Sequence, residues 1–112
     1  MSTANNFPEE KKMTVIFRIG PGSLGPEGVE YVVEFCEFAQ TQLQACAEYY
    51  LNWSIVPRFD KTLAEMKFQL GNKVLNEGQV IKYLGMFDEN YANFEEQLES
   101  NLEAIINQFF GR

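Results

Sequence analysis

Histidine is absent from this chain of 112 residues, and cysteine occurs only twice. Without histidine, the chain cannot form a Ser–His or Cys–His nucleophile pair, or a zinc or iron site that depends on histidine ligands. Two cysteines alone are also too few for a structural zinc site. Any catalysis would have to use carboxylates, lysine, tyrosine or cysteine, and no convergent group of such residues stands out. We therefore predict a protein that is not an enzyme and that needs no cofactor or metal.

Basic residues are scarce as well. Nine Lys and Arg residues stand against sixteen Asp and Glu residues, which gives a net charge of −7. Such a charge opposes binding to phosphate backbones and to anionic membrane surfaces. We therefore expect no nucleic-acid or membrane partner, and we favour a protein partner that is basic or that presents an apolar face.

Long apolar runs are also missing. No stretch reaches the roughly 18 consecutive apolar residues of a membrane-spanning helix, and residues 1–6 lack the apolar core of a signal peptide. A cytoplasmic location is therefore expected. Cys36 and Cys46 are consistent with a cytoplasmic location, where thiols stay reduced. They lie ten residues apart in one predicted helix, which separates them by roughly 15 Å, too far for a disulfide. We expect both as reduced thiols in the core.

Aromatic residues, by contrast, are abundant: the chain has ten Phe, five Tyr and one Trp. They provide enough apolar area for one hydrophobic core without disulfides. The polar residues 1–11 predict a disordered tail, and residues 12–112 predict a single α+β domain.

An apolar stripe at steps of three and four residues runs through the C-terminal third and predicts a helix. Its members are Val80, Leu84, Phe87, Tyr91, Phe94, Leu98, Leu102, Ile105 and Phe109. A continuous helix over this stretch would be roughly 45 Å long, which exceeds the width of a compact domain of this size. The helix must therefore kink near Gly85 and Asp88, overhang, or pack on a second copy of the chain.

The other elements follow from shorter patterns. Residues 14–19 are rich in β-branched residues and predict a strand, and residues 26–51 carry the apolar seam of a long helix. Residues 53–59 predict a short strand, in which Pro57 is allowed only at a sheet edge or at a bulge. Residues 64–70 alternate between apolar and polar, as a strand does, although a helix over residues 60–70 also fits.

The end of this alternating segment shows two further signals. Gly71 and Asn72 suit a tight type II′ hairpin turn, after which Val74 and Leu75 would return as a short strand. Asn76 and Gln79 have the spacing of a capping box that starts the last helix.

These elements predict an α+β fold in the order β-α-β-β-α. Two long helices would pack on one face of a small antiparallel sheet, and the excess of apolar helix surface favours a homodimer. An all-α helical bundle is the alternative, which requires residues 60–70 to be helical.

Gly20, Gly22 and Gly25 form a G-x-G-x-x-G spacing between a predicted strand and a predicted helix, as in dinucleotide-binding loops. Backbone N–H groups of such a loop can hold a phosphate or carboxylate at the helix N-terminus.

Three features weaken this interpretation. Pro21 and Pro26 remove two N–H donors, Glu27 would repel an anion, and no second parallel strand is evident after the helix. We prefer a connecting turn and keep a small-ligand or nucleotide site at Gly20–Gly28 as the alternative.

Acidic residues recur along one side of the last predicted helix. Glu95, Glu99 and Glu103 are one turn apart, and they provide a possible docking face for a basic segment. Phe94 and Phe109 are the apolar residues that we assign to the same partner-binding surface. The predicted function is a non-catalytic, cytoplasmic protein-interaction or regulatory module that acts as a small homodimer.

Overall fold

The structure is a computed structural model that describes residues 7–111, and it divides into two compact units between Val74 and Leu75. Each unit is described on its own. The elements of the first unit are β1 (Met13–Ile19), α1 (Gly28–Ala45), β2 (Leu51–Pro57), β3 (Met66–Leu70) and β4 (Lys73–Leu75), the last of which ends at the boundary. The second unit consists of α2 (Glu77–Gly85) and α3 (Tyr91–Phe110). The chain is therefore α+β, as predicted, with three α-helices among the described residues.

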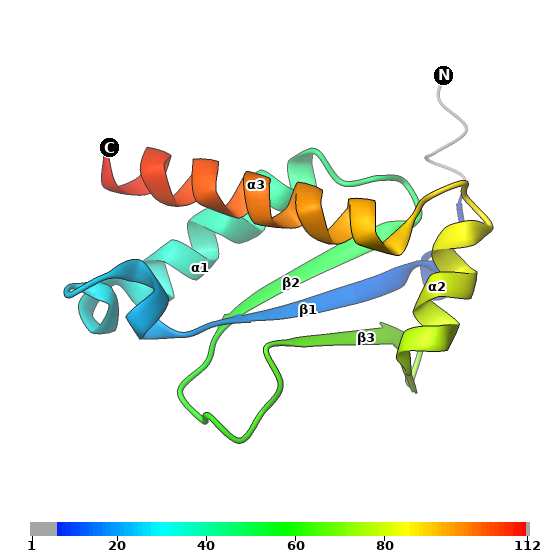
Figure 1. Ribbon diagram of the computed structural model, residues 1–112, viewed down its shortest axis with the longest axis horizontal. Coiled ribbons are helices and arrows are strands. Elements are labelled where there is room, and N and C mark those ends of the chain that lie inside the picture. Colours follow the sequence, from blue (N-terminus) through cyan, green and yellow to red (C-terminus); the bar gives the residue numbers. More distant parts are fainter. Residues whose placement is uncertain (1–6, 112) are drawn as a thin grey trace. The chain divides into compact units, whose positions relative to one another are not determined.

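The four strands form one sheet in the order β2-β1-β3-β4. Figure 1 shows β1 between β2 and β3. β1 is parallel to β2 and antiparallel to β3, so the sheet is mixed. The expectation of an antiparallel sheet is wrong. Helix α1 carries the chain back along the sheet, so that β2 runs in the same direction as β1. β1 then lies between β2 and β3, although their nearness in the sequence suggested that they pair.

The strand register separates an apolar face from a more polar one. The odd-numbered residues of β1, including Val15 and Phe17, are buried, and the even-numbered residues are half-exposed. Val15 lies opposite Trp53 of β2 and Phe68 of β3. This confirms the period-two pattern of β1, because alternate side chains of a strand point to opposite faces.

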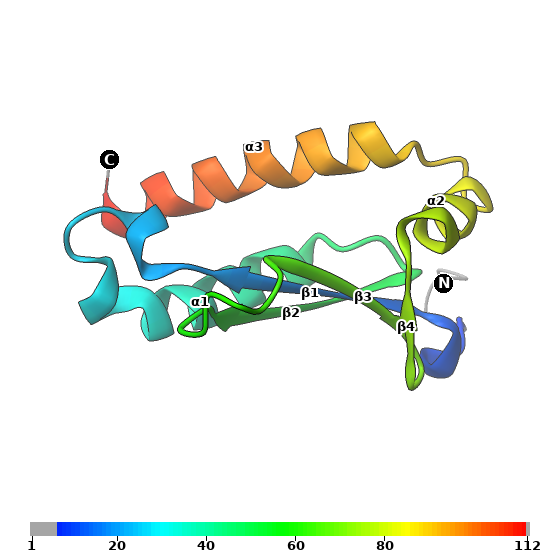
Figure 2. The ribbon, with the colours of Figure 1, turned by 60° about the horizontal axis from the view of Figure 1, so that its bottom comes forward.

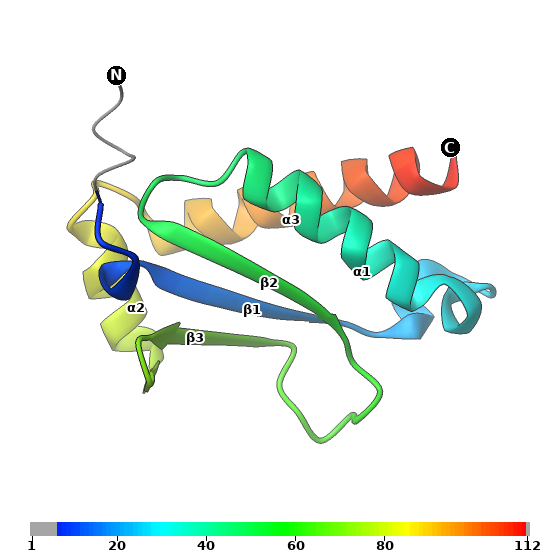
Figure 3. The same cartoon turned by 180° about the vertical axis from the view of Figure 1, so that it is seen from behind.

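Helix α1 lies alongside β2 (Figure 3). It begins at Gly28 instead of Pro26 and ends at Ala45, several residues earlier than predicted. Its buried residues Val32, Phe35, Cys36, Ala39 and Leu43 recur at helical spacing.

The two cysteines differ in their surroundings. Burial raises the pKa of the Cys36 thiol to about 11, so this thiol is protonated and unreactive at neutral pH. Cys46 follows the last residue of α1 and is exposed. The expectation that both thiols lie in the core is therefore correct only for Cys36.

Residues 60–70 are not helical. β3 covers Met66–Leu70, and β4 returns beside it after a two-residue turn (Figure 2). Gly71 has a φ of 63°, whereas Asn72 has no positive φ, which agrees with the predicted II′ turn. The all-α alternative is therefore wrong.

The apolar stripe of the C-terminal third is divided between two helices, so a continuous helix from Val80 to Phe110 does not form. α2 ends in a Schellman motif: the N–H of Glu89 donates to the carbonyl of Leu84 at 3.0 Å, and the N–H of Asp88 donates to Gly85 at 3.2 Å. Asp88 takes the left-handed position of this motif with a φ of 62°.

Side-chain caps mark the start of both helices of the second unit. Asn76 and Gln79 form the predicted capping box at the start of α2. Asn90 caps α3, because its side chain accepts hydrogen bonds from the backbone N–H groups of Ala92 at 2.8 Å and Asn93 at 3.2 Å.

Candidate functional site: the loop between β2 and β3

The chain segment of residues 58–65, which we call the β2–β3 loop, projects past the end of the strands that it joins (Figures 1 and 3). A loop without a strand ladder leaves its backbone carbonyls in need of other hydrogen-bond donors. In this loop, two arginine side chains supply several of those donors.

Arg58 braces the loop from its start. Its backbone N–H donates to the carbonyl of Ile19 at 2.8 Å, which fixes the residue to the end of β1. Its guanidinium then folds back along the loop, where Nε donates to the carbonyl of Leu63 at 2.9 Å and Nη2 donates to the carbonyl of Lys61 at 3.1 Å. One side chain therefore closes the loop on itself.

Arg18 holds the other end of the loop from β1. Its Nη1 donates to the carbonyl of Ala64 at 2.7 Å, and its backbone N–H donates to the carbonyl of Glu65 at 2.7 Å. Arginine suits both positions, because its planar guanidinium presents several N–H donors at once and remains charged at any physiological pH.

A local turn at Asp60 completes the loop. One carboxylate oxygen of Asp60 accepts hydrogen bonds from the hydroxyl of Thr62 at 2.6 Å and from the backbone N–H of Thr62 at 2.9 Å. These bonds, the one from the hydroxyl first, lower the pKa of Asp60, and the positive charge of Arg58 acts in the same direction. The carboxylate is therefore ionised in its role as an acceptor.

The braced loop displays two apolar side chains. Phe59 is 66% exposed and Leu63 is 44% exposed. Single exposed apolar residues are common on protein surfaces and need no explanation by themselves. Here, however, they are carried by a loop whose conformation is fixed by side-chain hydrogen bonds, and a fixed anchor loses less conformational entropy when it binds.

The glycine motif lies in a tightly turned segment. Pro21–Leu24 form a 3-10 turn, and three backbone N–H groups are used inside the segment. The donor and acceptor pairs are Ser23 to Gly20 at 2.9 Å, Gly25 to Gly22 at 3.3 Å and Gly28 to Gly25 at 3.0 Å. These bonds, together with the two prolines, leave few donors that could face an anion. Anion binding at Gly20, Gly22 and Gly25 stays a prediction.

The acidic residues assigned to partner binding lie on α3. Glu99 and Glu103 are exposed, and Glu95 is half-exposed. Phe94 is buried and stacks with Tyr91 at a ring-centroid distance of 6.5 Å. The structure does not test whether these residues meet a partner.

Phe109 is half-buried, and its ring lies edge-on to that of its neighbour Phe110 at a centroid distance of 5.0 Å. The assignment of Phe109 to a partner-binding surface also remains a prediction.

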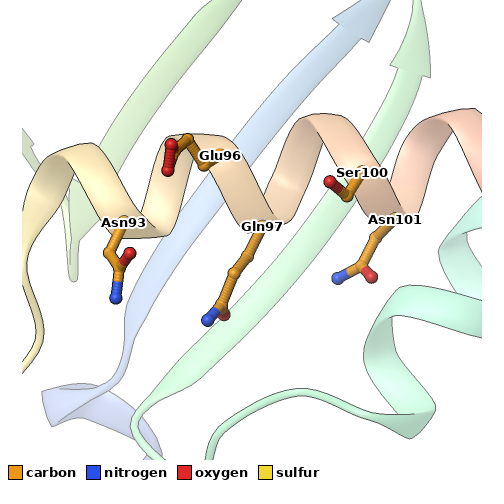
Figure 4. A pocket seen from close by; sticks show the side chains of 5 residues that line it. All are labelled: Asn93, Glu96, Gln97, Ser100 and Asn101. Carbon is orange, nitrogen blue, oxygen red and sulfur yellow. The ribbon is translucent and has the colours of Figure 1, made fainter.

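A shallow hollow of about 230 Å³ lies along the polar side of α3. Its lining residues are Asn93, Glu96, Gln97, Ser100 and Asn101, and Figure 4 shows the amides of Asn93, Gln97 and Asn101 pointing to the same side. All five residues are exposed. Small-molecule sites are normally concave and mostly apolar, so we do not assign a ligand to this hollow.

The braced conformation of the β2–β3 loop could not be predicted from the sequence. Arg58 and Lys61 are close together in the sequence, whereas Arg18 is distant from them. The local signal was Asp60 with Thr62 two residues later, which is the pattern of an Asx turn. The bond from Arg18 to Ala64 has no such signal, because 46 residues separate its partners.

Comparison of the chain with protein-family models, with curated proteins and with solved structures finds no match. Within residues 7–111, no three His, Cys, Asp or Glu side chains gather in a way that could hold a metal ion. None of the helices in this part of the chain combines the length and the apolar character that a bilayer crossing requires.

Proposed function

We propose that this chain is a non-catalytic, cytoplasmic protein-interaction or regulatory module that acts as a small homodimer and presents the β2–β3 loop to its partner. One observation carries the proposal: Phe59 is two-thirds exposed on a loop whose carbonyls are tied by Arg18 and Arg58. Aromatic side chains, phenylalanine included, are enriched in the buried cores of protein interfaces relative to the rest of the surface.

The surroundings of the anchor define the chemistry of the partner. Phe59 and Leu63 require an apolar pocket, and the cationic groups of Arg58 and Lys61 beside them favour acidic residues at the rim of that pocket. A separate contact through Glu95, Glu99 and Glu103 would suit a basic segment. The homodimer is supported by Val29 and Val33, which are 78% and 53% exposed and one turn apart on α1.

Site-specific photocrosslinking tests the role of the loop. A photoreactive phenylalanine analogue replaces Phe59 in one variant of the full chain and Met86 in a matched control, because Met86 is 68% exposed but lies outside the loop. We expect the variant at position 59 to form a discrete crosslinked complex in cells, and Arg58→Ala in the same chain to abolish it. Equal crosslinking at both positions would contradict a role of the loop.

A small-ligand or nucleotide site at Gly20–Gly28 is the second candidate function. One observation favours this site: β1, α1 and β2 form the strand, helix and parallel strand that a dinucleotide-binding motif requires. A thermal-shift screen with inorganic phosphate and nucleotides tests it. A ligand at 100 times its dissociation constant adds about 2.7 kcal/mol of stability, whereas an unchanged melting temperature with every anion would leave the segment as a connecting turn.

A further inference from the structure

The outer edge of β2 is one of the two edges of the sheet. An edge strand exposes a row of N–H and C=O groups, to which another strand can add. On β2, the groups of even-numbered residues face β1, as the neighbouring bonds from Met13 N–H to Tyr50 O at 3.0 Å and from Arg58 N–H to Ile19 O at 2.8 Å show. The groups of residues 51, 53, 55 and 57 therefore face outward.

Every one of these four outward positions is closed to an incoming carbonyl. The N–H of Leu51 donates to the carbonyl of Glu48 at 3.0 Å. The N–H of Trp53 donates to Oε1 of Gln44 at 2.9 Å. The N–H of Ile55 donates to Oε1 of Gln40 at 2.8 Å. Residue 57 is proline, which has no N–H.

Gln40 takes the place of a strand residue. Its Nε2 also donates to the carbonyl of Trp53 at 2.7 Å, so that its one carboxamide bonds to both the C=O of Trp53 and the N–H of Ile55. A single residue of a neighbouring parallel strand would bond to the same two groups. The α1 helix therefore supplies, through a side chain, the partner that a fifth strand would supply through its backbone.

Without these hydrogen bonds to Gln40 and Gln44, strand β2 would be prone to pair with β2 of another copy of the chain. The six residues of β2 before Pro57, Leu-Asn-Trp-Ser-Ile-Val, carry no charge, and three of them, Trp53, Ile55 and Val56, are aromatic or β-branched. Uncharged segments of this kind are the sequence signature of strand-mediated association. Lysine or arginine, which often protects edge strands, is not part of β2, so Pro57 and the two glutamines are the protection that remains.

We propose that Gln40 and Gln44 close the outer edge of β2, and that their carboxamides keep a second copy of the chain from adding its own β2 to this edge. Two copies related by a two-fold axis would pair their β2 strands antiparallel. The homodimer proposed above then has to use another surface, because this edge is occupied within each chain.

The test replaces both glutamines in the full chain with Gln40→Leu and Gln44→Leu, which retain the approximate volume and remove the hydrogen bonds. Gln42→Leu is the matched control, because Gln42 lies on the same helix and its side chain makes no hydrogen bond to β2. Amide hydrogen exchange of Trp53 and Ile55 by NMR and molar mass by light scattering are measured over a range of concentrations.

In the double variant at low concentration, we expect these two amides to exchange on the order of tenfold faster or more than in the original chain. At high concentration, the molar mass should rise above that of the original chain, while Gln42→Leu should change neither quantity. Unchanged exchange in a folded double variant would overturn the proposal. Faster exchange without any rise in mass, or equal changes in the control, would overturn it as well.

If circular dichroism shows that the double variant does not fold, Gln44→Leu alone decides the question. This variant opens only the N–H of Trp53, so the exchange of Trp53 should accelerate while that of Ile55 stays protected by Gln40. Equal protection of Trp53 in this variant and in the original chain would overturn the proposal.

Discussion

Two loops follow the carboxyl ends of the parallel strands β1 and β2, and they are held in opposite ways. Residues 20–27, after β1, close through short-range backbone bonds within their own turn. The β2–β3 loop depends on the side chains of Arg18 and Arg58. The difference shows how a surface can be fixed in place. A turn whose backbone N–H groups bond within the turn has few donors left for a ligand. The β2–β3 loop is held by arginine side chains instead, and Phe59 stays exposed on it.

The largest effect is expected where the first loop meets α1. In Gly28→Ala, the new Cβ would lie 1.7 Å from the carbonyl oxygen of Pro21, and a contact this close with backbone forces the turn and the helix apart. We expect a loss of about 3 kcal/mol in the free energy of unfolding, measured by urea denaturation. Gly22→Ala is the control, because its Cβ would meet nothing within 4 Å. Equal losses in both variants would show that close packing at Gly28 is not the cause.

A smaller effect is expected in the braced loop. Arg58→Ala removes the bonds to the carbonyls of Leu63 and Lys61, both of which can turn to water. We expect a loss of about 1 kcal/mol in the free energy of unfolding. Arg58→Lys should recover only part of it, because an ammonium group lacks the planar fork that reaches both carbonyls. Full recovery by lysine would mean that charge alone matters at this position.

The smallest effect is a dependence on pH that only the braced loop should show. The pKa of Asp60 is lowered in the folded chain, so its contribution to stability is present above its unfolded pKa of about 3.9 and is lost as the pH falls through the folded value. Asp60→Asn keeps an oxygen acceptor without the charge. The difference in unfolding free energy between the original chain and this variant should therefore shrink as the pH falls below about 4. A difference that stays constant with pH would contradict this account of Asp60.

The features that could be predicted from the sequence are those in which neighbouring residues act on each other. The alternation of β1, the turn at Gly71 and the capping box of Asn76 with Gln79 are all local, and the structure contains all three. The mixed sheet could not be predicted in this way, because strand direction depends on the path of α1. The hydrogen bonds from Gln40 and Gln44 to β2 could not be predicted for a related reason. In the sequence, these glutamines look like any other polar residues on a helix.

The division of the C-terminal stripe shows a different limit. The spacing of three and four residues continues across the break, because Phe87 and Tyr91 are four residues apart whether or not a helix joins them. Asp88 takes a left-handed conformation that glycine usually takes at this position, so the helix ends without the expected residue. Periodicity alone therefore overestimates the length of the helix.

If Arg18 and Arg58 hold the β2–β3 loop in one conformation, ¹⁵N relaxation of the backbone amides of residues 59–64 should show a rigid backbone. We predict order parameters near 0.85, as in rigid backbone, and values that fall below about 0.6 in Arg58→Ala. The amides of Ser23 and Gly25 should stay rigid in both proteins, because backbone bonds hold them. Order parameters below about 0.6 for residues 59–64 in the original chain would show that the two arginines do not hold the loop, and would contradict its role as a rigid support for Phe59.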